Sequence, residues 1–302
     1  MNVIIGSNLK IFLLEFRKGK ITLIQTVLEN SSKPVTDNQT VVSNPIFEEM
    51  LSKLRKIFVE EITKENSVLV NVKKDAIVKM AKFLSAHTKK PCTIGITGET
   101  ASGKSTITED IISSINDFAK RMNIKDPITR LNTDDYYYDR SQMVIDAGGF
   151  DNFVKNYDLD VPEAIELELM KKHIKSLVNL KRTYLPKYDM SGTAKRYDNY
   201  RLAKPARIII SEGLYSLNEK ISDVFDFKIY VDGSYQAQKL RFFQRAKARG
   251  LEASADTVYK NAKSKAEIYV CPCADDADII ISGEADRSRY KEFMTEILSL
   301  VQ

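Results

Sequence analysis

One stretch of the chain combines glycines, a lysine and a serine at a spacing that suits phosphate binding. Residues 98–105 match the pattern G-x-x-x-x-G-K-[ST], with an apolar run before them and a helical pattern after them. The glycines allow backbone amides to face phosphate oxygens, and a helix N-terminus adds the positive end of its dipole. Lys104 is expected to reach the β and γ phosphates, and the Ser105 hydroxyl to ligate Mg²⁺. The predicted contacts with a nucleoside triphosphate are Gly98, Glu99, Thr100, Ala101, Ser102, Gly103, Lys104, Ser105 and Thr106.

Acidic residues follow the next predicted strand, at Asp134, Asp135 and Asp139. The glycine-rich stretch 98–106 is called the phosphate cradle below. A carboxylate at the carboxyl end of a strand, opposite this cradle, lies where an acceptor hydroxyl would be activated. The alternative is a solvated turn. The cradle beside them favours the catalytic interpretation.

The elements that would position these residues form an alternating pattern after Pro91. Short Ile- and Val-rich runs at 92–97, 127–133, 206–211, 227–232 and 277–282 alternate with longer helical stretches. Such runs are typical of parallel strands covered on both faces. We therefore predict an α/β three-layer fold with a mostly parallel sheet over residues 91–302.

Residues 1–90 show a different pattern of apolar and polar residues and are predicted to form an N-terminal α+β accessory segment. Two short strands are expected, at 2–16 and 18–29, followed by a polar loop. Asn44-Pro45 is typical of a helix start, and residues 73–87 show a second helical pattern. The segment is either a packed layer or a regulatory, partner-binding one.

Composition limits the classes of protein that remain. The 302 residues are 43% hydrophobic and carry 46 basic and 41 acidic side chains, a net charge of +5, which is too weak to indicate a nucleic-acid partner. No apolar run approaches the roughly 18–20 residues that span a bilayer, so no membrane partner is expected. Three cysteines cannot form a disulfide framework, which favours a cytoplasmic location. A homo-oligomer is left open.

Six motifs in chain order resemble the uridine kinase and phosphoribulokinase family, over roughly residues 91–286. Each is weak alone, but together and in register they form a specific set. After the glycine-rich stretch they are Asp134-Asp135-Tyr136-Tyr137, Leu159-Asp160-Val161-Pro162-Glu163-Ala164, Pro186-Lys187-Tyr188-Asp189-Met190, Ile208-Ile209-Ile210-Ser211-Glu212-Gly213-Leu214, the arginines Arg241, Arg245 and Arg249, and Ala277-Asp278-Ile279-Ile280-Ile281.

The resemblance implies roles for four residues in phosphoryl transfer. Asp134 would be the general base that orients and deprotonates the acceptor hydroxyl. Glu212 would bind Mg²⁺ directly or through water, or else cap the turn that follows its strand. Arg241 and Arg245, four residues apart on one helix face, would approach the β and γ phosphates, or would form a solvated basic face.

The resemblance also implies an acceptor site built from Tyr137, Asp160 and Tyr188. Asp160 would hydrogen-bond sugar hydroxyls, and Tyr188 with the residues after it would line a base. Uridine-specific relatives carry a phenylalanine and a histidine where this chain has Met190 and Thr193.

Basic residues follow this motif, and the two histidines lie elsewhere in the chain. Lys195 and Arg196 would place positive charge near an anionic acceptor, or lie in a mobile surface loop. His173 occurs in a lysine-rich helical stretch that is typical of a solvated face.

These residues together predict an ATP- and Mg²⁺-dependent kinase that acts on a hydroxyl of a small molecule. A nucleoside such as uridine or cytidine is the first candidate acceptor. Another small metabolite, such as a sugar, a sugar phosphate or pantothenate, is the alternative. A nucleotide-switched binding protein is the rival of a different class, disfavoured because the chain has no N-K-x-D motif for reading guanine.

Overall fold

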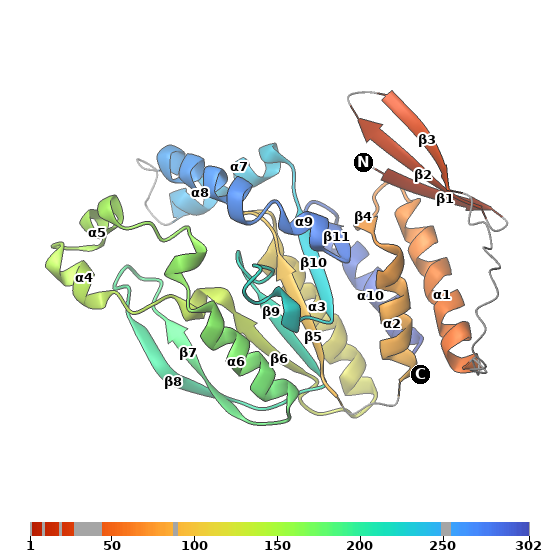
Figure 1. Ribbon diagram of the computed structural model, residues 1–302, viewed down its shortest axis with the longest axis horizontal. Coiled ribbons are helices and arrows are strands. Elements are labelled where there is room, and N and C mark those ends of the chain that lie inside the picture. The colour runs from red at the N-terminus through yellow and green to blue at the C-terminus, as the bar shows by residue number, and fades with distance from the viewer. Residues whose placement is uncertain are drawn as a thin grey trace, which may run out of the picture.

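The structure, a computed structural model, describes residues 2–7, 10–17, 20–26, 44–86, 90–248 and 255–301, with side chains from residue 44 onward (Figure 1). Its central element within these residues is a six-stranded sheet in the order β4-β11-β10-β5-β9-β6. All neighbours pair in parallel except β4, which runs antiparallel to β11 at the edge. The strands are β4 (Leu69–Val72), β5 (Cys92–Thr97), β6 (Ile128–Asn132), β9 (Ile208–Glu212), β10 (Phe227–Asp232) and β11 (Ile279–Ser282). The predicted mostly parallel α/β fold is confirmed.

Successive residues of the central strands bury opposite faces of this sheet. Ile209 and Tyr230 belong to one apolar core, whereas Ile210 and Val231 belong to the other. The first core is covered by α6 (Leu167–Val178), and the second by α3 (Lys104–Arg121), α10 (Arg287–Ser299) and α1 (Pro45–Ile62) (Figure 1). Burial on both faces explains why the strand sequences are continuous apolar runs.

Shorter elements surround the carboxyl ends of the parallel strands. A hairpin of β7 (Thr183–Tyr188) and β8 (Arg196–Ala203) extends from this region, and α7 (Tyr235–Ala248) and α8 (Ala255–Tyr269) lie above it (Figure 1). After β6 the chain forms η1 (Thr133–Tyr136), α4 (Ser141–Asp146), α5 (Phe150–Asn156) and η2 (Pro162–Ala164). By contrast, η3 (Ser222–Val224) and α9 (Cys273–Asp276) directly precede β10 and β11 and lie at the amino ends of these strands. Of the helices the structure describes, none is long and apolar enough to cross a membrane.

The N-terminal segment differs from its prediction in its strands. Three strands, not two, pair as an antiparallel sheet: β1 (Asn2–Ser7), β2 (Lys10–Arg17) and β3 (Lys20–Thr26). The predicted helices are confirmed as α1, whose first turn is capped by the Asn44 side chain accepting from the Ile46 amide at 3.1 Å, and α2 (Lys74–Ser85). Strand β4, which extends the central sheet, was not predicted.

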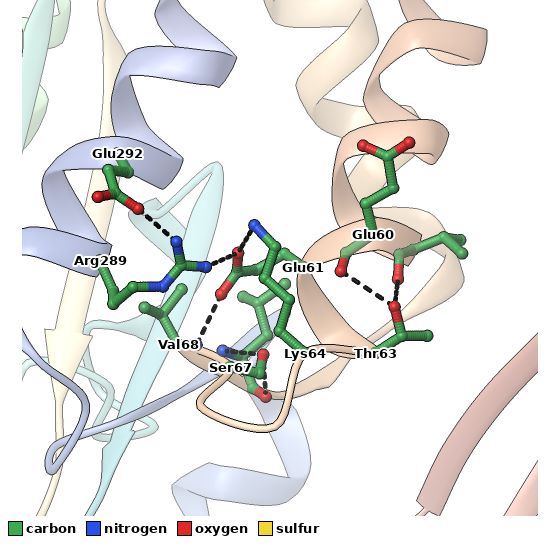
Figure 2. A network of polar contacts seen from close by, with 10 residues as sticks. Glu60, Glu61, Thr63, Lys64, Ser67, Val68, Arg289 and Glu292 are labelled. Atoms are coloured by element: carbon green, nitrogen blue, oxygen red, sulfur yellow. Dashed lines mark hydrogen bonds and ion pairs between the residues drawn. The ribbon is translucent and has the colours of Figure 1, made fainter.

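A buried carboxylate joins α1 to the C-terminal helix (Figure 2). Glu61 is fully buried, and its Oε1 accepts from the Val68 amide at 2.9 Å. Its Oε2 accepts from Lys64 Nζ and from an Arg289 guanidinium nitrogen, each at 2.9 Å. Residues 44–86 therefore share their core and polar contacts with α10. The domain boundary at residue 90 stays a prediction.

Candidate active site

The glycine-rich stretch forms the turn between β5 and α3. Gly98 (φ +153°) permits a close approach, since a Cβ there would lie 2.3 Å from the carbonyl oxygen of Val231. Gly103 (φ +106°) precedes the first turn of α3, where no described side chain caps the backbone amides. Ser105 and Thr106 in that turn are exposed. Uncapped amides at a helix N-terminus are suited to hold an anion.

Lys104 starts α3 and points back over the cradle. Its Nζ donates to the carbonyl oxygen of Glu99 at 2.8 Å. Burial lowers the pKa of Lys104 to about 8, while the Asp134 and Glu212 carboxylates act in the opposite direction. Lys104, Asp134 and Glu212, all predicted from the sequence, thus lie close enough to interact electrostatically.

Asp134 lies in η1, at the carboxyl end of β6. Asn132 fixes its backbone, because the Asn132 Oδ1 accepts from the Asp134 amide at 2.9 Å. Burial raises the pKa of Asp134, with Lys104 lowering it and Glu212 raising it further. A carboxylate with a raised pKa beside a cation is suited to accept a proton.

Glu212 ends β9 between the other two strands of the site. Parallel register pairs it with Ile96 and with Asn132, so the three strands end at the same level. Its Oε1 accepts from Arg130, whereas its buried Oε2 has no partner among the described residues. An unpartnered buried carboxylate oxygen is unfavourable unless a ligand completes it.

The residue after Glu212 has to be glycine. Gly213 has a φ of +137°, and a Cβ there would lie 1.8 Å from the Thr133 hydroxyl oxygen. Only a glycine lets β9 turn away directly beside η1, which brings Glu212 close to Asp134.

Two of the predicted arginines reach the cradle from α7, and the third, Arg249, lies outside the described residues. An Arg241 guanidinium nitrogen donates to the carbonyl oxygen of Ser102 at 3.2 Å. An Arg245 nitrogen donates to the Thr100 hydroxyl, also at 3.2 Å. Both positive charges therefore lie against the phosphate cradle and not on a separate solvated face.

Two of the predicted acceptor residues pack together next to Asp134. The rings of Tyr137 and Tyr188 are 5.0 Å apart, and the buried Tyr188 hydroxyl has no partner among the described residues. Burial raises the pKa of Tyr137, and the nearby Asp134 and Asp160 carboxylates raise it further. Burial also raises the pKa of Asp160, which is half-buried. Both aspartates are therefore near Tyr137.

The predicted basic residues are placed differently from each other. Arg196 is paired within the protein, with Glu166 at 2.8 Å and with Asp198 at 3.0 Å. Lys195 is exposed, with its Nζ 4.9 Å from the ring centroid of Tyr197. Their role toward an acceptor stays a prediction, and Arg196 has a structural role as well.

The positions expected to line a base lie at the surface. Met190 is 64% exposed. The exposed Thr193 donates its hydroxyl hydrogen to Asp189 at 2.6 Å.

The expectation for His173 was wrong. It is half-buried, and its Nδ1 lies 3.0 Å from the Tyr136 hydroxyl. The lysines beside it suggested a solvated face, but Met170, Ile174 and Leu177 on the same helix are buried.

Several polar residues of the site were missed by sequence reasoning. Arg130 pairs with Glu212, and an arginine inside a buried strand was a signal that such a partner exists. Lys187 pairs with Asp135 at 2.9 Å. Lys263 pairs with Glu99 from 164 residues away, and no local pattern could have revealed it.

A phosphate cradle, a lysine, the half-buried Asp134 and the buried Glu212 at one edge of a parallel sheet define a phosphoryl-transfer enzyme. Comparison with known proteins identifies the family. The Phosphoribulokinase / Uridine kinase family matches residues 93–288, and the chain belongs to this family. It is thus an ATP-dependent kinase that phosphorylates a hydroxyl group.

Its relatives include proteins named uridine kinase from three kinds of organism. The one from Clostridium tetani is 32% identical over 197 residues, covering 64% of this chain and 87% of the relative. That from Halobacterium salinarum is 29% identical over 197 residues, covering 64% and 80%. That from Saccharomyces cerevisiae is 32% identical over 232 residues, covering 74% of this chain and 44% of the longer yeast protein.

Proposed function

We propose that the protein transfers the γ-phosphoryl group of Mg²⁺-bound ATP to a hydroxyl of a nucleoside, with Asp134 as the general base. The observation that carries this proposal is the position of the Asp134 carboxylate. It is half-buried at the carboxyl end of β6, and its strongest charged neighbours are Lys104 and Glu212. A hydroxyl bound beside it would face the phosphate cradle.

Asp134 would contribute mainly by orienting the acceptor and receiving its proton. Its raised pKa brings its basicity closer to neutral pH while Lys104 keeps the carboxylate ionised. Phosphoryl transfer passes through a loose transition state, so positioning contributes more than proton removal.

The residues present fit a Mg²⁺ ion. The Glu212 Oε2, which has no partner among the described residues, and the hydroxyl of the exposed Ser105 are oxygen ligands of the kind that Mg²⁺ prefers. No cluster of three His, Cys, Asp or Glu side chains that could hold a metal exists among the described residues, as expected where phosphates and water complete the coordination. When bound, Mg²⁺ would neutralise charge on the phosphate oxygens.

The arginines of α7 would act on the same phosphates. Arg241 and Arg245 already contact the backbone and side chain of the cradle at 3.2 Å. Short movements of long side chains would bring their charges onto the β and γ phosphates, where negative charge spreads during transfer.

A nucleoside is the first candidate acceptor, supported by the relatives named uridine kinase. Asp160 could receive hydrogen bonds from a ribose, and the Tyr188 hydroxyl is free among the described residues to bond a polar group. A different small metabolite is the second candidate, because Met190 is exposed and the Thr193 hydroxyl is bonded to Asp189. Neither side chain presents the ring stacking and fixed donor that discriminate a base.

A panel of acceptors, followed by ADP release with the full chain, tests the proposal. Nucleosides, sugars, sugar phosphates and pantothenate are compared at equal concentration, with product formation measured alongside. ADP should appear in step with a phosphorylated nucleoside. A sugar phosphate or pantothenate that is used far better than every nucleoside would replace the acceptor, and ATP hydrolysis unaffected by any acceptor would favour the nucleotide-switched alternative.

A further inference from the structure

The phosphate cradle contains a carboxylate of its own. Glu99 is the second residue of the glycine-rich stretch, and its side chain is only 11% exposed. Its carbonyl oxygen accepts from Lys104, so its backbone helps to hold the lysine that binds phosphate. A negative charge buried in this loop would repel a triphosphate unless another group compensates it.

The compensating group comes from α8. Lys263 Nζ forms an ion pair with the Glu99 Oε2, and its side chain is 20% exposed. Gln238 on α7 completes the arrangement: its Nε2 donates to the Glu99 Oε1 at 3.4 Å, and its Oε1 accepts from Lys263 Nζ at 3.3 Å. The Gln238 amide is itself held by the carbonyl oxygen of Gly233 at 2.8 Å.

The neighbouring lysines of α8 do not share this position. Lys260 is fully at the surface, where it pairs with Asp256 one helical turn away. Lys265 pairs with Asp158, and the side chains of the two residues are 32% and 45% exposed. Lys263 is the α8 lysine among these three whose charge is buried against the cradle.

We infer that Lys263 is a positioning residue that sets the affinity of the cradle for ATP by neutralising Glu99. With the ion pair intact, the cradle carries the net positive charge of Lys104 and the α7 arginines. Without Lys263, the buried Glu99 carboxylate would be uncompensated next to the triphosphate. The position of α8 is thereby coupled to nucleotide binding. The inference concerns ATP alone and does not depend on which acceptor is used.

Titration calorimetry of Mg²⁺-ATP binding to the full chain tests this inference. Lys263→Met should weaken ATP binding by about tenfold or more, within the range typical of coupling between charged groups. Lys260→Met removes a lysine of the same helix that lies away from the cradle, and should change the dissociation constant by less than about twofold.

The double variant separates charge compensation from a general structural effect. When Glu99→Gln is already present, adding Lys263→Met should change ATP affinity by less than about threefold, because no buried charge is left to compensate. This comparison also applies if Lys263→Met alone does not fold. Wild-type affinity in Lys263→Met would overturn the inference, as would a full loss of affinity on adding Lys263→Met to Glu99→Gln.

Discussion

Two glutamates, Glu61 and Glu212, are almost completely buried, yet their surroundings differ. Both oxygens of Glu61 are occupied, by a backbone amide, a lysine and an arginine (Figure 2). Glu212 has one oxygen on Arg130 and the other without a partner among the described residues. Glu61 joins α1 to α10, whereas Glu212 ends β9 at the strand edge that carries the cradle.

The difference indicates what each buried charge does. A carboxylate whose hydrogen bonds are all made stabilises the fold, since removing it leaves its partners unpaired. A carboxylate left half-satisfied weakens the fold and is retained where a ligand completes it. Glu61 is therefore assigned to structure, and Glu212 to the proposed metal site.

The largest expected effect is on catalysis, at Asp134. Asp134→Asn removes the proton acceptor at nearly constant shape, so the kcat should fall by about 10²–10⁴-fold. ATP affinity should be retained or slightly higher. The matched control is Asp135→Asn, whose carboxylate pairs with Lys187. An inactive Asp135→Asn together with an active Asp134→Asn would show that Asp135, not Asp134, is the base.

At Glu61 the expected effect is on stability. Glu61→Gln should lower the free energy of unfolding by about 3 kcal/mol, because Arg289 and Lys64 lose a buried counter-charge. Glu60→Gln, on the exposed side of the same turn, is the control and should change it by less than about 0.5 kcal/mol. Denaturant unfolding measures both. Equal stabilities of the two variants would contradict the structural role of Glu61.

Lys104 gives a pH dependence of intermediate size. Since the pKa of Lys104 is lowered to about 8, the free protein loses this positive charge as the pH rises through 8. ATP needs the charged form, so ATP affinity should be full below pH 7 and fall by about tenfold between pH 7 and pH 9. Lys104→Met should bind ATP weakly, with the pH-dependent step removed. A step of the same size in this variant would assign it to another group.

The smallest expected effect is at Lys265. Its ion pair with Asp158 is partly exposed, so Lys265→Met should lower the free energy of unfolding by less than about 1 kcal/mol. If Lys265→Met lowered the free energy of unfolding as much as Glu61→Gln does, burial would not explain the difference between the two ion pairs.

The parallel strands could be predicted because burial on both faces leaves continuous apolar runs, as in β9 and β11. The edge strand β4 could not, since its four residues include a polar Asn71 and give too short a pattern. In the N-terminal segment a Gly-Ser-Asn run at residues 6–8 was an available turn signal between the first two strands.

Within the candidate site, the residues in local motifs could be predicted and their distant partners could not. Lys104, Asp134 and Glu212 each lie in or directly after a strand–turn pattern, which fixes them near one edge of the sheet. The pairing of Glu99 with Lys263 depends on how α8 packs, and nothing in the sequence around either residue specifies it.

The contrast between the two glutamates is tested most directly by Glu212→Gln, measured for both stability and rate. Glu212 has one charged partner, which is 35% exposed, and one buried oxygen without a partner among the described residues, whereas Glu61 has three partners. Removing its half-compensated buried charge should therefore change the free energy of unfolding by less than about 1 kcal/mol. The rate of ADP formation should fall by at least about tenfold, and more Mg²⁺ should be needed to reach half of the maximal rate. A loss of about 3 kcal/mol in stability with an unchanged rate and Mg²⁺ dependence would contradict the assignment, because Glu212 would then act as Glu61 does.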